Sequence, residues 1–458
     1  MKSVALHNLG CKVNTYELDV MRQMLQENGY EIVPFAQKAD IYIINTCTVT
    51  NIADRKSRQM LHRARKQNPQ AVVVAVGCYV QTALHAEDLG ADIIIGNNRK
   101  GQIVRILEEY FASHATHDTV VDIAHAYEYE ELVLTKPQEH VRAFLKIQDG
   151  CNQFCTYCAI PLARGRVRSR KPEHVLAEAR ALADAGCKEL VLTGIHLSSY
   201  GLDFLGIRSA DYRDAAKAGF LAELVEQLAE IPGICRIRLG SLEPRIVTRE
   251  LAERLAKCKK LCPHFHLSLQ SGCDAVLKRM NRHYDTEYFA QSVKILREAF
   301  QRAAVTTDVI VGFPGETEEE FAATKAYVER IGFYEMHVFK YSKREGTPAA
   351  VMEAQVPDSV KARRSDELLA VSDRLSEAYR AQYIGQPMEI LTEEYKEIGG
   401  VRYLIGHTED YVLAAVPEGE IQPNRIVRGV GERLLQDGEL QVILLREISF
   451  IAKFGEVE

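Results

Sequence analysis

Short apolar runs alternate with stretches of helical spacing over the first part of the chain. The apolar runs are SVALHNLGC, DIYIINTC, AVVVAVGC and ADIIIGN, which begin at residues 3, 40, 71 and 91. Runs of this length, separated by helices, are typical of a parallel sheet built from β-α units. We therefore predict an α/β domain with a parallel sheet over residues 1–112.

A second alternation follows residues 113–140, a polar and weakly periodic stretch that we interpret as a linker. Its strand-like runs are VRAFLKIQ, KELVLTG, RIRLGS, HFHLSLQ, VTTDVIVGF and EMHVFKYS, mostly separated by helical segments. Units of this kind in order predict a full or partial β/α barrel over residues 141–356. The active sites of such barrels lie at the carboxyl ends of the strands.

The last part of the chain changes pattern twice. Residues 357–384 carry apolar positions at helical spacing and predict a connecting helix. Residues 385–458 contain short strand-like runs separated by turn signals, among them PMEILTEE, VRYLIGHTED and LQVILLREI. This pattern predicts a small all-β barrel.

The composition bounds the kind of protein but not its activity. The chain has 458 residues, 47% hydrophobic and 26% charged, and no apolar run long enough to cross a bilayer, so we expect no membrane partner. The start, MKSVALHNLGC, lacks the pattern of a secretory signal, which favours a cytoplasmic protein. In that compartment the eleven cysteines are expected to be metal ligands, catalytic thiols or buried residues rather than disulfides. The net charge of -6 argues only against wholesale nonspecific binding of polyanions.

Three cysteines crowd the segment GCNQFCTYC at the end of the first predicted barrel strand. Cys151, Cys155 and Cys158 have the spacing C-x3-C-x2-C. Soft thiolates select zinc, copper(I) or iron-sulfur clusters, but a structural zinc site needs four ligands and no second C-x-x-C follows at a suitable distance. A four-iron cluster on three cysteines leaves one iron open, which suits chemistry at the mouth of a barrel.

A second set of three cysteines is spread over the first domain. Cys11, Cys47 and Cys78 each follow the carboxyl end of a predicted strand. In an open parallel sheet these ends share one edge, where binding crevices form. We therefore predict that the three thiols meet at a metal site, and zinc remains possible from these positions alone.

The C-x3-C-x2-C loop resembles the signature of the radical S-adenosylmethionine (SAM) enzymes, and further motifs resemble the methylthiotransferase family within that class. These motifs span nearly the whole chain in order: GCKVN, NTC, VGCYVQ, LTGIHLSSYG, RIRLGSLEP, HLSLQSG, RMNRHY, DVIVGFPGE and YSKREGTPAA. Family members combine an N-terminal cluster-binding domain, a radical SAM barrel and a small C-terminal RNA-binding barrel called TRAM. The resemblance implies that the three predicted segments correspond to these domains.

The resemblance also implies the cofactors, which are SAM and two [4Fe–4S] clusters. The cluster of Cys151, Cys155 and Cys158 would bind SAM and deliver one electron, which yields methionine and a 5'-deoxyadenosyl radical. The auxiliary cluster of Cys11, Cys47 and Cys78 would carry the sulfur that is methylated and then joined to a substrate carbon. An electron donor such as flavodoxin or ferredoxin is implied as well.

Several residues after other barrel strands are candidates for contacts with SAM. Glycine at two of these positions suits close approach of a ligand, although a plain turn would also explain it. Polar side chains at the other strand ends could bond the ribose or the amino acid part of SAM, or have structural roles. The candidates are Gly194, Ser241, Glu243, Gln270 and Gly312.

Basic segments suggest how RNA could be held. The run LARGRVRSRK contains five candidates for contacts with phosphate: Arg164, Arg166, Arg168, Arg170 and Lys171. A second basic run, DRKSRQMLHRARK, lies on the predicted helix after Cys47. A solvated surface explains some of these residues equally well, and the small terminal barrel supports RNA binding only by analogy.

The motifs GCKVN, KIQDGCN, HVF and REGTPAA most resemble the branch that acts on N6-threonylcarbamoyladenosine at position 37 of tRNA, in the anticodon stem-loop. The resemblance thus implies methylthiolation at C2 of that nucleoside. Departures from the branch occur at Thr15, His196, Lys340 and Lys343. The alternatives are the same reaction on isopentenyladenosine 37, methylthiolation of a ribosomal-protein aspartate, or a noncatalytic RNA-binding protein with structural metal.

Overall fold

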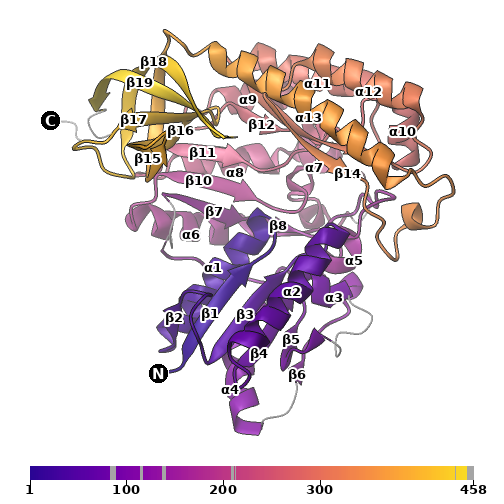
Figure 1. Cartoon of the computed structure of the whole chain (residues 1–458), viewed down its shortest axis with the longest axis vertical. Helices are drawn as coiled ribbons and strands as arrows, with labels where there is room; N and C mark the ends of the chain where they lie inside the picture. Colours follow the sequence, from indigo (N-terminus) through magenta and orange to yellow (C-terminus); the bar gives the residue numbers. More distant parts are fainter. Residues whose placement is uncertain are drawn as a thin grey trace.

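The computed structural model describes residues 1–82, 89–113, 117–136, 141–207, 211, 213–438 and 440–450. The chain forms an N-terminal sheet domain, a central barrel and a small C-terminal barrel, which follow one another in sequence (Figure 1). This architecture agrees with the predicted α/β class and its all-β end. None of the described helices is long and apolar enough to cross a membrane.

The N-terminal domain is a six-stranded sheet in the order β2-β1-β3-β4-β5-β6, with all neighbouring strands parallel. Helices α1 and α4 cover one face, where Leu18 and Ile106 pack against Ile43, and α2 covers the other through Leu61. The elements are β1 (Ser3–Asn8), α1 (Lys12–Glu27), β2 (Glu31–Val33), β3 (Ile41–Thr46), α2 (Asn51–Gln67), β4 (Val72–Gly77), α3 (Cys78–Thr82), β5 (Ile93–Ile95), α4 (Ile103–Ser113) and β6 (His117–Asp118).

The stretch interpreted as a linker, residues 113–140, contributes to both neighbouring domains where it is described. Strand β6 is the edge strand of the N-terminal sheet. Leu132 and Leu134 are buried in the core of the central barrel, and the hydroxyl of Tyr16 donates to the carbonyl of Leu132 at 2.6 Å. The linker interpretation missed these contacts because the apolar run of residues 132–134 is too short to predict a helix or strand.

The central barrel is of the partial kind. Two three-stranded parallel sheets, β7-β10-β11 and β12-β13-β14, are joined by the bridges Ile237–Leu261 and Leu242–Leu267. Among the described strands β14 does not pair with β7, so the barrel stays open on one side. The strands are β7 (Arg142–Lys146), β10 (Glu189–Thr193), β11 (Arg236–Leu239), β12 (His264–His266), β13 (Ala304–Val311) and β14 (Glu335–Lys340), with a hairpin of β8 (Gln148–Asp149) and β9 (Arg168–Ser169).

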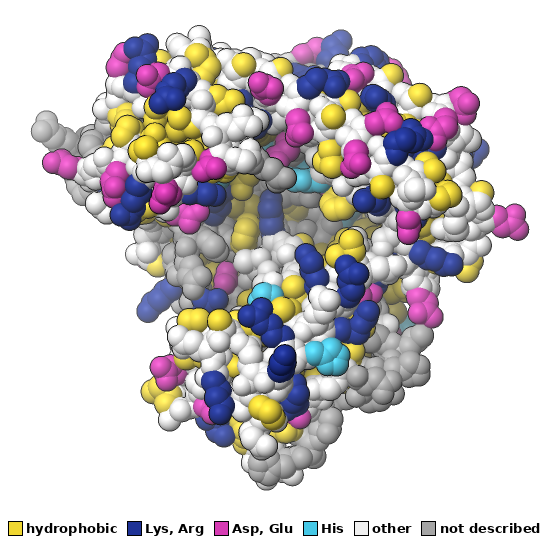
Figure 2. Space-filling view, viewed as in Figure 1, with side chains coloured by type: hydrophobic (Ala, Val, Ile, Leu, Met, Phe, Trp, Pro, Cys, Tyr) yellow, Lys and Arg dark blue, Asp and Glu magenta, His cyan; other side chains and the backbone are white. Residues whose placement is uncertain are grey.

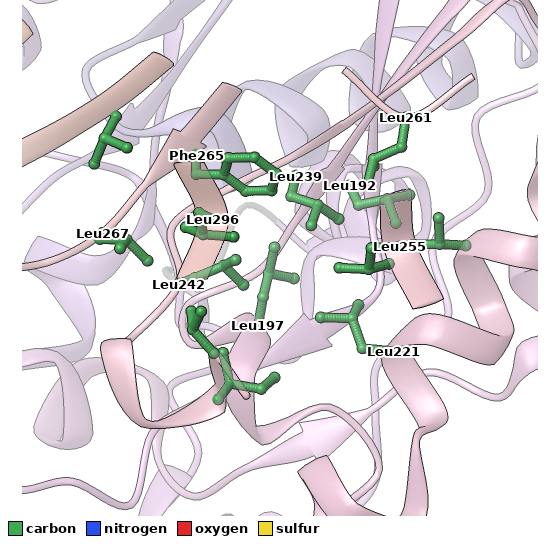
Figure 3. Packing of buried hydrophobic residues seen from close by; sticks show 14 of the residues in the cluster. Leu192, Leu197, Leu221, Leu239, Leu242, Leu255, Leu261, Phe265, Leu267 and Leu296 are labelled. Atoms are coloured by element: carbon green, nitrogen blue, oxygen red, sulfur yellow. The ribbon is translucent and has the colours of Figure 1, made fainter. Parts of the chain in front are cut away.

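Helices pack outside the barrel strands and bury leucines between them. Figure 3 shows Leu192, Leu239 and Phe265 from β10, β11 and β12 meeting Leu255 and Leu296 from the helices. Each fully buried side chain of this size contributes about 2 kcal/mol through the hydrophobic effect. The helices are α5 (Ile160–Arg164), α6 (Pro172–Asp184), α7 (Arg213–Ala218), α8 (Phe220–Ala229), α9 (Arg249–Ala256), α10 (Asp274–Arg279), α11 (Thr286–Ala299) and α12 (Glu318–Ile331).

Helix α13 (Asp358–Ala381) packs on β14 and leads to the C-terminal barrel. That barrel is closed in the order β15-β16-β17-β19-β18. Two buried arginines of β11 dock it, because Arg236 donates to the carbonyl of His407 and Arg238 to the carbonyl of Glu409, both at 2.8 Å. Its strands are β15 (Pro387–Ile398), β16 (Val401–Thr408), β17 (Leu413–Pro417), β18 (Ile426–Asp437) and β19 (Leu440–Phe450).

Candidate functional site: two cysteine triads around one cavity

The cysteine loop of residues 150–158 follows the hairpin strand β8 near the carboxyl end of the barrel. Gly150 has φ +71°, and a Cβ there would lie 1.8 Å from the carbonyl oxygen of Arg166, so glycine is required. The amide of Cys151 donates to the carbonyl of Gly165 at 3.0 Å. The amide of Thr156 donates to the carbonyl of Met280 at 3.1 Å. The segment around Met280 therefore supports the loop from across the barrel.

The three thiols of this loop act on one another electrostatically. Burial raises the pKa of Cys151, and Cys155 and Cys158 raise it further. Burial also raises the pKa of Cys158 to about 12. A guanidinium N–H of Arg282 donates to the Sγ of Cys155 at 3.1 Å. Three close thiols with one cationic partner suit a bound soft metal group, which replaces their protons and compensates their charge.

The second triad stands at the carboxyl ends of the adjacent strands β1, β3 and β4. Cys47 and Cys78 are buried, whereas Cys11 is exposed. Burial raises the pKa of Cys47 to about 12, and its neighbours Cys78 and Cys11 add to the shift. The structure thus brings together three thiols that lie far apart in the sequence, on the sheet edge where they were expected.

A buried arginine connects the two triads. Arg164 lies on α5, directly after the cysteine loop, and its Nε–H donates to the Sγ of Cys78 at 3.3 Å. Its guanidinium also bonds both carboxylate oxygens of Glu17, at 2.8 and 3.0 Å, and Asp149 at 3.1 Å. Although burial alone favours the neutral acid, Arg164 and two lysines hold the pKa of Glu17 well below its usual range.

The charges around Arg164 leave a positive surplus next to Cys78. Lys146 and Lys100 both pair with Glu17, and Lys146 also pairs with Asp149 at 2.6 Å. Arg168 also lies 3.8 Å from Asp149, so four cations face the carboxylates of Glu17 and Asp149 in a region that is almost fully buried. The Sγ of Cys78 accepts a hydrogen bond from Arg164 and so lies at the edge of this cationic cluster.

Three of the five arginine and lysine candidates for RNA contacts were wrong. Arg164, Arg168 and Arg170 are buried and bonded inside the protein, Arg170 to Glu178 at 2.5 Å, so they are closed to phosphate. The basic run is therefore not a solvated strand, because it passes from the end of α5 at Arg164 through β9 at Arg168 and turns these side chains into the protein. Arg166 stays partly exposed with its guanidinium 4.3 Å from the ring centre of Phe154, and Lys171 is exposed.

A cavity of about 270 Å³ lies between the N-terminal domain and the barrel. One wall is the loop of residues 48–50, which follows Cys47, and the opposite walls include Cys158, Gln270 and Asp308. Figure 2 shows this side of the molecule hollowed between the N-terminal domain and the parts above it. Cys158 of the first triad lines this space, and the loop that lines it on the other side begins directly after Cys47 of the second triad.

Arg344 fixes the loop that walls this cavity. It comes from the segment after β14 and donates to the hydroxyl of Thr48 and the side-chain oxygen of Asn51, each at 2.6 Å. It also pairs with Asp54 at 2.6 Å. The loop beside Cys47 is thus held by the barrel as well as by its own domain.

The two candidate glycines are explained by the protein itself. A Cβ on Gly194 would lie 2.9 Å from the side-chain oxygen of Gln148. Gly312 has φ +69°, and a Cβ there would lie 2.3 Å from the side chain of Lys361. Close packing and turn geometry account for both, and a contact with SAM stays a prediction.

The polar candidates differ in their surroundings. Ser241 is exposed, whereas Glu243 is buried, and burial raises the pKa of Glu243. One carboxylate oxygen of Glu243 lies 3.8 Å from Arg282, which reaches Cys155. Gln270 lines the cavity with φ +70°, a rare conformation for a non-glycine residue that favours a functional role.

Sequence reasoning missed the roles of Arg282, Arg344 and His196. The first two stand in the quoted motifs RMNRHY and YSKREGTPAA, but neither spacing nor charge says that they reach a cysteine or its loop. Burial, with Arg282 and Arg245, lowers the pKa of His196 to about 3, so its imidazole is neutral. Its Nδ1 lies 2.7 Å from the hydroxyl oxygen of Ser199.

Comparisons with known proteins define the class first. The model of the radical SAM superfamily matches residues 145–328, and that of an uncharacterized protein family, UPF0004, matches residues 3–96. Among solved structures, the radical SAM methyltransferase TsrM from Kitasatospora setae aligns with a TM-score of 0.55 at 19% identity, over 77% of this chain and 75% of that one. The fold is therefore that of a radical SAM enzyme.

The curated relatives then narrow the class to a family. The threonylcarbamoyladenosine tRNA methylthiotransferase MtaB of Bacillus subtilis is 44% identical over 93% of both chains. MtaB of Aquifex aeolicus is 37% identical, covering 89% of this chain and 97% of the relative. The tRNA-2-methylthio-N(6)-dimethylallyladenosine synthase of Desulfitobacterium hafniense is 34% identical over 95% of both. The chain belongs to the radical SAM methylthiotransferase family, whose cofactors are SAM and two [4Fe–4S] clusters.

Proposed function

We propose that the protein attaches a methylthio group to C2 of N6-threonylcarbamoyladenosine 37 in the anticodon stem-loop of tRNA. The observation that carries the proposal is the cavity that lies between Cys158 of one cysteine triad and the loop that follows Cys47 of the other. The 44% identity to a threonylcarbamoyladenosine tRNA methylthiotransferase supports this substrate over isopentenyladenosine. A ribosomal-protein aspartate and a noncatalytic role are less well supported by these relatives.

The cysteines divide between two clusters in this proposal. Cys151, Cys155 and Cys158 hold the cluster that binds SAM, and Cys11, Cys47 and Cys78 hold the auxiliary cluster. When bound, these cofactors supply one-electron chemistry at an unactivated C–H bond and the sulfur that is transferred. The donor sets fit, because each consists of three thiols in a partly buried site, where burial and the neighbouring thiols raise the pKa of Cys151 in one set and of Cys47 in the other.

The other residues of the site bind and orient in this proposal. Glu243 and Gln270 are placed to bond the polar parts of SAM, since both are buried near Cys155 or Cys158. Arg282 and Arg164 donate to ligand sulfurs on either side, which stabilises thiolates. Arg344 keeps the loop after Cys47 against the cavity. The loop thereby limits the entry of water beside the reacting groups.

The surface next to the cavity suits RNA. Helix α2 presents a basic face, and Figure 2 shows Lys and Arg side chains gathered over this part of the N-terminal domain. Exposed Val49, Ile52 and Phe339 lie in or near the cavity rim, where a nucleobase can stack or pack. We assign the C-terminal barrel to a TRAM-like RNA-binding role. The reductant is proposed to be flavodoxin or ferredoxin in the cytoplasm, where tRNA is found.

Nucleoside mass spectrometry of tRNA tests the proposal. A strain that lacks the gene should lose 2-methylthio-N6-threonylcarbamoyladenosine and regain it when the intact gene is supplied. The Cys155→Ala gene should not restore it. Loss of the isopentenyl derivative instead would move the chain to the other substrate, and unchanged nucleosides would overturn tRNA methylthiolation altogether.

A further inference from the structure

Three polar side chains form a group on the inner wall of the barrel. His266 of β12, Asp308 of β13 and His337 of β14 each place one side-chain nitrogen or oxygen within 4.8 Å of the others. The Nε2 of His266 lies 3.3 Å from a carboxylate oxygen of Asp308. The Nδ1 of His266 lies 3.0 Å from the hydroxyl of Thr306, which fixes the orientation of the ring.

This polar group faces the cavity and not the core. On β13, Val309 and Val311 belong to the apolar core, whereas Asp308 and Ile310 line the cavity. Side chains alternate along a strand, and Asp308 stands directly beside His337 in the register of β13 and β14. Asp308 is therefore part of the cavity wall, and His266 and His337 stand beside it on the two neighbouring strands.

A wall of this kind selects its ligand by polarity. The side chain of Asp308 is 28% exposed and that of His266 only 12%, so an apolar ligand pressed against them would remove the remaining water without replacing its hydrogen bonds. A polar ligand that offers both donors and acceptors would satisfy the carboxylate of Asp308 and the imidazole of His337 together. Lys340 adds a positive charge, because it also lines the cavity.

We infer that His266, Asp308 and His337 form the subsite that binds the threonylcarbamoyl group of the target adenosine. The inference rests on the proposed function and names the residues that choose its substrate. The hydroxyl and ureido N–H groups of the substituent are donors for Asp308, which His266 orients, and the carboxylate of the substituent accepts from His337. Lys340 compensates the remaining negative charge of that carboxylate. An isopentenyl group offers none of these bonds.

Binding of anticodon stem-loop RNA to the reconstituted holoenzyme tests the subsite. Three RNAs that differ only at position 37, carrying threonylcarbamoyladenosine, isopentenyladenosine or plain adenosine, are titrated by fluorescence anisotropy with SAM and without reductant. The wild-type protein should bind the threonylcarbamoyl RNA about tenfold more tightly than the plain RNA, as loss of a charged hydrogen bond predicts. His337→Leu should remove most of this preference without changing the affinity for plain RNA.

Two further variants serve as controls for this experiment. His337→Gln keeps a hydrogen-bond donor and should retain part of the preference, which also covers the case that the leucine variant does not fold. His174→Leu changes a histidine on the outer helix α6 and should behave as wild type. An unchanged preference in both His337 variants, or an equal loss of affinity for all three RNAs, would overturn the subsite.

The same experiment separates this inference from its foundation and from a metal site. If wild-type protein and reductant methylthiolate the threonylcarbamoyl RNA while His337→Leu keeps its preference, the proposed function stands and the subsite is wrong. If the wild-type protein methylthiolates only the isopentenyl RNA, the proposed function fails first. Stoichiometric binding of Mn²⁺ to the holoenzyme, seen by electron paramagnetic resonance (EPR) and lost in His337→Leu, would replace the subsite by a metal site.

Discussion

The two cysteine triads reach similar arrangements by different routes. Cys151, Cys155 and Cys158 share one loop, so a tight turn of nine residues is enough to gather them. Cys11, Cys47 and Cys78 follow three different strands and meet only because β1, β3 and β4 are neighbours in the sheet. The first triad is therefore a local feature of the chain, and the second depends on the whole domain.

The supporting arginines reverse this contrast. Cys155 receives its hydrogen bond from Arg282, which is 127 positions away in the sequence. Cys78 receives one from Arg164, which follows the cysteine loop of the other triad. Each triad thus receives a hydrogen bond from a distant segment, and the triad of Cys11, Cys47 and Cys78 receives it from the barrel.

The largest expected effect comes from substitution of a cysteine in the loop of Cys151, Cys155 and Cys158. In the proposed function Cys155 is a ligand of the cluster that binds SAM. We expect Cys155→Ala to lose reductive SAM cleavage completely, because the two remaining thiolates do not hold the cluster. Formation of 5'-deoxyadenosine under anaerobic reduction measures it. Cys273→Ala, at the start of α10 and outside both triads, is the matched control and should cleave SAM normally.

Loss of a cysteine from the triad of Cys11, Cys47 and Cys78 should affect a different step of the reaction. Cys47→Ala is expected to abolish the methylthio product while SAM cleavage continues, because the cysteine loop of the barrel keeps its own ligands and Arg282. Product and 5'-deoxyadenosine are measured in the same reaction. Cys262→Ala removes another buried thiol and should leave both intact. Normal methylthio product from Cys47→Ala would exclude the auxiliary site.

The contrast also explains what the sequence predicts and what it does not. Local signals located the strands, the cysteine loop and the three strand-end cysteines, since apolar periodicity and spacing are properties of neighbouring residues. Arg164, Arg168 and Arg170 were assigned to RNA because charge in a sequence says nothing of burial. Glu17 and Asp149, which neutralise Arg164, lie in other segments, and only tertiary structure brings them together.

A single substitution can remove the bonds that Arg164 makes to Cys78, Glu17 and Asp149. Arg164→Met keeps the volume but leaves Glu17 and Asp149 with less compensation, so unfolding free energy should fall by about 3–5 kcal/mol, as for other broken buried ion pairs. Anaerobic chemical denaturation followed by circular dichroism measures it. Arg166→Met, two positions along and partly exposed, should change stability by less than about 0.5 kcal/mol. The EPR signal of the auxiliary cluster should also shift only in Arg164→Met.

The smallest expected effect is a change in the pH dependence of stability. The pKa of His196 is lowered to about 3 in the folded protein, against an ordinary value of 6.5. The unfolded chain therefore takes up this proton first as pH falls, so the stabilising contribution is present above pH 6.5 and is lost progressively between 6.5 and 3. Each pH unit in that window lowers the free energy of unfolding by about 1.4 kcal/mol through this group.

His196→Asn removes the titrating ring. Between pH 7.5 and pH 5.5 the free energy of unfolding of this variant should fall by about 1 kcal/mol less than that of the wild type. An equal loss in both proteins, measured by denaturation at the two pH values, would show that His196 is protonated in the fold and that Arg282 and Arg245 do not keep it neutral.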